Sequence, residues 1–141
     1  MASSSWSTTA VGRLTLAALI VLGCAGPVRA ADFDGTKPLI CAVTTIMECD
    51  AGQCDRYAPE GTPAGAPRFI KVDIAAKEIT ASAGRKSTLG SSAHIDGRLV
   101  LHGGENGRGW SATIDEDSGE MSAAVIDKDH TFSLFGACTT P

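Results

Sequence analysis

Three side chains near the middle of the chain have the types that a hydrolytic triad uses. Ser92, His94 and Asp96 alternate along a segment with the pattern of a β-strand. Side chains two positions apart on a strand lie about 6.5–7 Å apart, too far for the linked hydrogen bonds of a triad. The segment also lacks a G-x-S-x-G motif. We therefore expect no nucleophilic catalysis from these residues.

Histidines and acidic residues offer two candidate metal sites, and neither has a specific pattern. His94, His102 and His130 fall on separate predicted hairpins, where histidines on a polar face are the commoner finding. The stretch DEDSGE at 115–120 resembles a calcium loop, but its glycine stands at the fifth position and Ile126 occupies the place of the bidentate Glu. We expect a solvated turn there, and no metal or other cofactor.

The glycine-rich run GGENGRG at 103–109 has the composition of a phosphate-binding loop but not its context. It has no Lys-Ser/Thr ending, and no helix is predicted after it to point backbone N–H groups at an anion. Asn106-Gly107 is the favoured centre of a type I′ hairpin turn. We therefore expect a hairpin in which Glu105 lies opposite Arg108.

Turn sequences also predict side-chain positions in two hairpins. The register just described places Trp110 over Gly103 on an apolar face. At the turn 96–97, a two-residue connection would place His94 opposite Leu99 on the same apolar face. Because a histidine is unfavourable there, we expect a bulge or a longer loop at this turn.

The N-terminal residues have the pattern of a secretory signal peptide. Arg13 precedes the apolar run Leu14–Leu22, and the sequence V-R-A at 28–30 supplies a cleavage site. This nine-residue run is too short to cross about 30 Å of hydrocarbon as a helix. We expect cleavage after Ala30, which leaves residues 31–141 as a single domain without a transmembrane helix.

A lipoprotein is the alternative for this region. The sequence V-L-G-C ending at Cys24 resembles a lipobox, in which the cysteine would be lipidated. Leu22 is not the favoured residue before the lipobox glycine, so we favour cleavage after Ala30 and a periplasmic or secreted protein.

Composition excludes several classes of protein. The chain has 141 residues, of which 43% are hydrophobic and 20% charged, so it is neither long enough for several domains nor polar enough for disorder. Its formal net charge is −4, and loss of Arg13 and Arg29 makes the mature chain more acidic. Such a charge provides no basic surface for binding nucleic acid.

Cysteine content predicts a disulfide-bonded fold. Removing Cys24 with the signal peptide leaves an even number of cysteines: Cys41, Cys49, Cys54 and Cys138. In an exported chain this favours two disulfides over a metal site, because there is no C-x-x-C knuckle and the compartment is oxidising.

Geometry indicates which cysteines pair. Cys49 and Cys54 flank a short loop with Gly52 in it, so they are expected to close that loop. Cys41 then pairs with Cys138. Period-two alternation supports this bridge, because each cysteine shares a strand face with apolar residues: Leu39, Val43 and Met47 for the first, Phe132 and Leu134 for the second.

The remaining pattern is one of short strands separated by turn residues, which predicts an all-β domain. About eight strands joined by short turns suggest an antiparallel meander, closed into a small barrel or, alternatively, folded into a sandwich. The expected strands are Leu39–Glu48, Arg68–Ile74, Glu78–Ala83, Ser87–Ile95, Arg98–Glu105, Arg108–Asp115, Glu120–Asp127 and Thr131–Cys138.

A thirteen-residue segment, Asp55–Pro67, reads as neither strand nor tight turn. Loops of this length in compact domains are usually functional or disordered. The adjacent Cys49–Cys54 loop would tether it and present Arg56 and Tyr57 as a candidate binding loop. The alternative is a Pro/Gly/Ala excursion without a role.

Five segments occur in a distinctive order: FDGTKPLICAV, MECDAGQCDR, PRFIKVDI, DGRLVLHGGENGRGWSATIDEDSGEM and FGACTT. In this order they resemble a family of small exported proteobacterial proteins with no assigned activity. The similarity covers residues 33–140, and ENGRGWS and FGAC are its most specific parts. It implies export and a single β-domain, and it carries over no catalytic residue.

Together these observations predict an exported, non-enzymatic binding module of the bacterial envelope, with an envelope protein as its partner. Small barrel inhibitors of lysozyme are analogous in architecture only. The alternative is a small-ligand carrier with a cavity inside the barrel, and an enzyme is the third reading. An apolar cavity of about 300 Å³ or more would favour the carrier, whereas a filled core would favour the protein binder.

Overall fold

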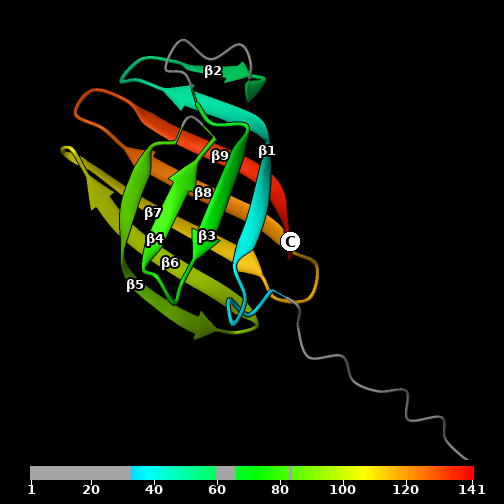
Figure 1. The fold of residues 1–141 in the computed structure, drawn as a ribbon. Helices are drawn as coiled ribbons and strands as arrows, with labels where there is room; N and C mark the ends of the chain where they lie inside the picture. Colours follow the sequence, from blue (N-terminus) through cyan, green and yellow to red (C-terminus); the bar gives the residue numbers. More distant parts are fainter. Residues whose placement is uncertain (1–32, 60–65, 83) are drawn as a thin grey trace, which may run out of the picture.

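The computed structural model describes residues 33–59, 66–82 and 84–141 of the chain (Figure 1). The expected signal peptide at 1–30, with Cys24, lies outside these residues, as does Ala83 at the expected end of one strand. Six residues of the expected binding loop, 60–65, lie outside them as well.

Within the described residues, nine antiparallel strands form one sheet, in the order β2-β1-β3-β4-β5-β6-β7-β8-β9, and β1 also pairs with β9. Eight of them, β1 and β3 to β9, therefore close into a barrel, and β2 is an additional strand beside β1 (Figure 1). This confirms the predicted all-β meander and its closure. The strands are β1 Leu39–Cys49, β2 Cys54–Tyr57, β3 Phe69–Asp73, β4 Glu78–Ala81, β5 Lys86–Ile95, β6 Arg98–Glu105, β7 Arg108–Asp115, β8 Glu120–Ile126 and β9 Thr131–Thr139.

The core lies inside the barrel and follows from the period-two pattern of the strands. Alternate residues point inward, and those that are apolar and buried include Leu39, Ile46, Leu99, Leu101 and Ile114. Short turns bring consecutive strands together, so each apolar face meets the next one around the barrel.

The β6–β7 hairpin has the predicted register. Glu105 lies opposite Arg108, and Gly103 lies opposite Trp110. A Cβ atom added at Gly103 would overlap the indole ring of Trp110, so this glycine lets the indole lie flat against the strand. The glycine-rich run is thus a hairpin turn, with positive φ at Asn106 and the glycine that follows it.

The β5–β6 turn differs from expectation. It is a two-residue turn with positive φ at Asp96 and Gly97, and His94 does lie opposite Leu99. The expected bulge or longer loop at this turn is absent from the described β5–β6 hairpin, and β5 has a separate bulge at Gly90. His94 remains in solvent because β4 pairs only with the first residues of β5, so the end of β5 extends past the barrel wall.

Strand β1 contains a bulge that reverses its faces. Its pairing with β9 shifts register between Val43 and Thr45. Beyond the bulge Ile46 is completely buried and faces the core, whereas Met47 is only partly buried. The prediction that Met47 shares a face with Cys41 is therefore wrong, because the extra residue in the bulge shifts the alternation by one.

Both predicted disulfides form. Cys41 bonds to Cys138 and links β1 to β9 at the closure of the barrel, and Cys49 bonds to Cys54 across the β1–β2 hairpin. Cys41 and Cys138 are buried, whereas Cys54 is exposed.

The two ends of the barrel differ. At one end the β3–β4, β5–β6 and β7–β8 turns meet the N-terminal segment of the described chain (Figure 1). Phe33 from that segment packs against the core, and Gly35 passes close to Ile74 and Leu99, so side chains fill this end. At the opposite end lie the β4–β5, β6–β7 and β8–β9 turns and the β1–β2 hairpin.

Candidate ligand cavity

A cavity of about 280 Å³ lies inside the barrel at the end that carries the β1–β2 hairpin. Its volume is close to the lower limit of about 300 Å³ for small-molecule sites. At about 30 Å³ per water-sized group, it holds a ligand of roughly nine non-hydrogen atoms. The cavity wall is mainly apolar and includes Ile46, Pro67, Ile79, Trp110, Val125, Phe132 and Leu134.

These wall residues come from strands that are distant in sequence. Ile46 of β1 pairs with Leu134 of β9, and Trp110 of β7 pairs with Val125 of β8. All four side chains line the cavity. The bulge in β1 is what turns Ile46 toward this space.

Trp110 is the largest wall residue and is fixed in place. Gly103 on the paired strand has no side chain and so leaves room for the indole ring, whose Nε1 donates a hydrogen bond of 2.9 Å to Ser87 Oγ. The polar atom of the ring therefore has a partner, while its apolar surface borders the cavity.

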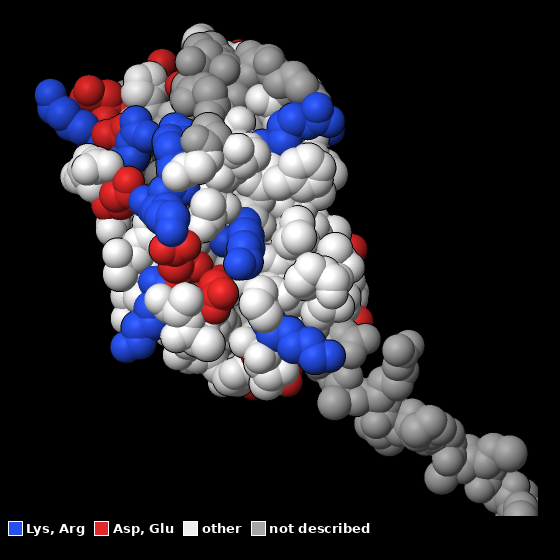
Figure 2. Space-filling model, viewed as in Figure 1, with Lys and Arg blue, Asp and Glu red and all other residues white. Residues whose placement is uncertain are grey.

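Charged side chains surround the mouth of the cavity in pairs. Arg108 Nε donates to Asp127 Oδ2 at 2.6 Å, and Lys86 Nζ lies 3.0 Å from Glu78 Oε2. The backbone N–H of Lys128, followed by the Arg108 guanidinium, lowers the pKa of Asp127. Figure 2 shows Lys and Arg interspersed with Asp and Glu over β3, β4 and β5, rather than a surface of one sign.

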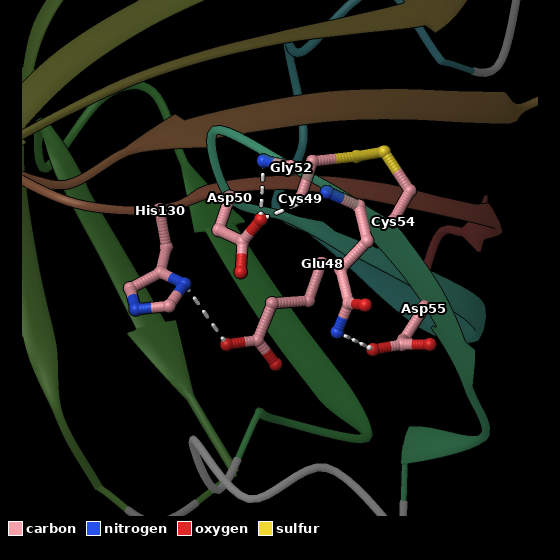
Figure 3. The surroundings of a disulfide bond; sticks show 8 residues. Glu48, Cys49, Asp50, Gly52, Cys54, Asp55 and His130 are labelled. Atoms are coloured by element: carbon pink, nitrogen blue, oxygen red, sulfur yellow. Dashed lines mark hydrogen bonds and ion pairs between the residues drawn. A yellow bond between two sulfur atoms is a disulfide. The ribbon is translucent and has the colours of Figure 1, made fainter.

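Glu48 lies on the inner side of the barrel at the hairpin end. It follows Ile46 by two residues on β1 and pairs directly with Phe132, and both of these residues line the cavity. Its Oε1 is 3.5 Å from His130 Nδ1, and Figure 3 shows the two side chains pointing toward one another. Its Oε2 is buried and has no hydrogen-bond partner among the described residues.

The other acidic residues of the β1–β2 hairpin have partners (Figure 3). Asp50 Oδ1 accepts hydrogen bonds from the backbone N–H groups of Gly52 and Gln53, which lower the pKa of its carboxyl group. Asp55 Oδ2 accepts a hydrogen bond from the Gln53 side chain at 3.3 Å. Together with the Cys49–Cys54 disulfide, these contacts give the hairpin tip a fixed shape.

The candidate binding residues Arg56 and Tyr57 lie on a strand, so the prediction of an irregular segment from Asp55 is wrong at its start. β2 pairs residue by residue with the end of β1. Its four residues include two charged ones and show no alternation of apolar and polar residues that would indicate a strand. Arg56 is exposed, with a contact of 3.4 Å to Thr45 Oγ1. Tyr57 packs against the core. This burial is the main cause that raises the pKa of its hydroxyl group, and the negative charge of Asp55 is the next.

The three histidines considered from sequence as a shared metal site are spatially dispersed. His94 Nδ1 lies 2.6 Å from Glu116 at the filled end of the barrel, whereas His130 lies at the cavity end and His102 on the outer face of β6. Across the described ranges, no three His, Cys, Asp or Glu side chains are grouped to hold a metal ion.

The stretch 115–120 forms a turn organised by its own first residue. Asp115 Oδ1 accepts hydrogen bonds from the backbone N–H groups of Asp117 and Ser118 and from the Ser118 hydroxyl. The Ser118 hydrogen bonds lower the pKa of the Asp115 carboxyl. An oxygen engaged in this way stabilises the turn.

Within the part of the chain that the structure covers, no helix has the length and apolar composition needed to cross a membrane.

Comparison of the chain with protein-family models, with curated proteins and with solved structures finds no match in any of the three. The resemblance to small exported proteobacterial proteins stays a prediction. Any assignment of function therefore depends on the geometry of the cavity.

The sequence suggested a cavity inside the barrel only as the alternative to a filled core, and it did not indicate Glu48. Which residues of β1 point inward after Val43 depends on where the bulge lies. No sequence feature of residues 43–48 indicates the position of that bulge. The one usable signal was Trp110 over Gly103, which was correctly placed on the apolar face.

Proposed function

We propose that the protein is an exported, non-enzymatic binding protein that holds a small, mainly apolar molecule in the barrel cavity. The observation that supports this most strongly is the apolar cavity of about 280 Å³. Strands of the barrel surround it, side chains fill the opposite end of the barrel, and charged groups border its mouth. This arrangement is typical of small-molecule sites, in which apolar walls provide affinity and a few polar groups orient the ligand.

The cavity favours the carrier function over the protein-binding function that the sequence suggested first. A carrier needs an interior space, and the cavity of about 280 Å³ lies just below the value of about 300 Å³ expected of a carrier, whereas a protein binder is expected to have a filled core. Trp110 and Phe132 supply aromatic surface despite the low aromatic content of the chain. An aromatic or branched ligand of roughly nine non-hydrogen atoms fits this space.

Binding can be measured through Trp110. Trp110 is the only tryptophan of a chain that begins at Ala31, and a W6F variant makes it the only one of the full chain, so fluorescence reports on the cavity wall. We expect a saturable change in fluorescence on titration with phenethyl alcohol, a neutral probe of suitable size, with a dissociation constant in roughly the millimolar range or below.

A cavity-filling variant and a matched control make this test specific. Val125→Phe places a larger side chain in the cavity and is expected to weaken binding roughly tenfold or more, the ratio that corresponds to about 1.4 kcal/mol. Ile126→Phe changes the next residue of the same strand, which points outward and is 59% exposed, and should leave binding unchanged. Equal effects of the two substitutions, or no saturable binding, would contradict the proposal.

Export of the protein is part of the proposal. Two disulfides are compatible with an oxidising compartment. The apolar run Leu14–Leu22 and the V-R-A site at 28–30 support a periplasmic or secreted location. Mass spectrometry of the exported protein should find its N-terminus at Ala31, whereas a diacylglyceryl mass on Cys24 would indicate the lipoprotein alternative.

A second candidate function is binding of an envelope protein through β2. Among the described residues, β2 pairs with β1 on one edge only, and the Cys49–Cys54 disulfide holds it in place. An edge strand of this kind can add a partner's strand, with Arg56 exposed beside it. Affinity capture from periplasmic extract should then recover one protein with the unaltered chain and lose it with Arg56→Ala.

A further inference from the structure

We infer that the ligand of the cavity carries a cationic ammonium group, or a comparable N–H donor, that binds the Glu48 carboxylate. This inference rests on the proposed function and specifies the chemical class of the ligand. Three observations support it: the position of Glu48, the state of its two oxygens, and the pairing of the other charges at the mouth.

The position of Glu48 makes it a neighbour of the cavity. Ile46 and Glu48 lie on the same face of β1, and Glu48 is directly opposite Phe132 on β9. Directly opposed residues on antiparallel strands have Cβ atoms about 4.5–5.5 Å apart. Glu48 does not itself line the cavity, but it adjoins two residues that do, so a ligand that extends from Ile46 and Phe132 toward the β1–β2 hairpin approaches its side chain.

The two oxygens of Glu48 differ in their surroundings. Oε1 faces His130 Nδ1 at 3.5 Å, which is a weak contact. Oε2 is buried without a partner among the described residues, and the side chain as a whole is only 19% exposed. A buried acceptor without a donor is unfavourable, so a ligand donor that reaches Oε2 gains more here than at a solvated carboxylate.

The other acidic groups near the mouth already have donors. Asp50 accepts two backbone N–H groups, and Asp127 accepts Arg108 Nε. Glu105 accepts a hydrogen bond from Asn106 Nδ2 at 2.9 Å. Glu48 is thus distinguished from them by its unpartnered buried oxygen. A charge-assisted hydrogen bond from an ammonium group would give this oxygen a donor.

The ligand class predicted is a small amphiphilic amine, with an aromatic or branched apolar body in the cavity and its ammonium group at Glu48. Phenethylamine, phenethyl alcohol and phenylacetate have similar apolar bodies and carry a cation, a neutral hydroxyl and an anion at neutral pH. Titrating all three into the W6F chain separates the contribution of the cavity from that of the charge.

We expect phenethylamine to bind roughly tenfold tighter than phenethyl alcohol, since hydrogen bonds between charged groups are among the stronger polar contacts. Glu48→Gln should remove this preference and should weaken phenethylamine far more than phenethyl alcohol. Glu105→Gln, which alters a carboxylate at the mouth that already has a donor, should keep the preference. In the W6F chain with Glu48 intact, the NMR shift of its side-chain carboxyl carbon should move on addition of phenethylamine.

Each contrary outcome has a separate meaning. If phenethyl alcohol binds but phenethylamine binds no tighter, or if phenylacetate binds tightest, the inference about Glu48 is overturned while the proposed cavity function stands. If none of the three probes binds, the proposed function fails and the inference fails with it. Because Gln has nearly the same shape as Glu, Glu48→Gln is expected to retain the fold, and its melting temperature checks this.

Discussion

Single residues determine how closely the side chains that line the cavity can approach the strands. Gly103 is the clearest case, because the indole ring of Trp110 occupies the space where another residue would have its Cβ. In this position the ring lines the cavity, and its Nε1 donates a hydrogen bond to Ser87. One glycine thus determines the position of the largest wall residue.

Gly103→Ala is therefore expected to destabilise the protein by about 1–3 kcal/mol, the usual cost of overpacking. The added methyl group would overlap Trp110 and would lie 2.6 Å from the Thr88 carbonyl oxygen. Denaturant unfolding followed by Trp110 fluorescence in the W6F chain measures the change.

Gly109→Ala provides a control on the partner strand of the same hairpin. A Cβ atom added there meets nothing within 4 Å, and the residue is exposed. Its free energy of unfolding should differ little from that of the unaltered chain. A similar loss of stability in both variants would show that the Trp110 contact is not the cause.

At the scale of elements, the β6–β7 turn was more predictable than the β5–β6 turn or the strand interiors. Asn106-Gly107 fixed the β6–β7 register because two-residue turns leave one way of pairing the strands. The bulges at Gly90 and after Val43 depend on how the barrel closes, which is a property of distant strands. For this reason Met47 was assigned to the wrong face, and the residues that β1 contributes to the cavity were not predicted.

The β1–β2 hairpin shows the same limit in another way. Its four-residue strand β2 contains two charged residues and has no apolar alternation, so its sequence resembles a loop. Pairing with β1 and the Cys49–Cys54 disulfide hold it as a strand. Tertiary contacts of this kind override local sequence preference.

The two disulfides should differ in how easily they are reduced. Cys54 is exposed, whereas Cys41 is completely buried and Cys138 nearly so. We expect mild reductant under native conditions, followed by alkylation and peptide mapping, to label Cys49 and Cys54 first. Labelling of Cys41 and Cys138 at an equal rate would contradict the buried position of that bridge.

At the scale of the whole molecule, carboxylates in the turns stabilise both ends of the barrel. Hydrogen bonds from backbone N–H groups and neighbouring side chains lower the pKa values of five carboxyl groups: Asp34, Asp50, Glu78, Asp115 and Asp127. A group with a lowered pKa in the folded state contributes stability at higher pH and loses it when the folded carboxylate is protonated.

We therefore expect the melting temperature to be constant near neutral pH and to fall as the pH drops below the ordinary values of 3.8 for Asp and 4.5 for Glu. The decrease should continue below those values, because the folded-state pKa values are lower still. Asp115→Asn should make the acid part of the curve shallower. A melting temperature that rises on acidification would contradict this account.

A methyl NMR titration with phenethyl alcohol tests most directly whether a ligand binds inside the barrel, at the end opposite the N-terminal segment. We expect saturable shifts of the methyl groups of Ile46, Val125 and Leu134, which line the cavity, and little change at Leu39 and Leu99 at the filled end. Shifts confined to the outward-facing Ile95 and Ile126, or no saturable shift at any methyl group, would contradict it.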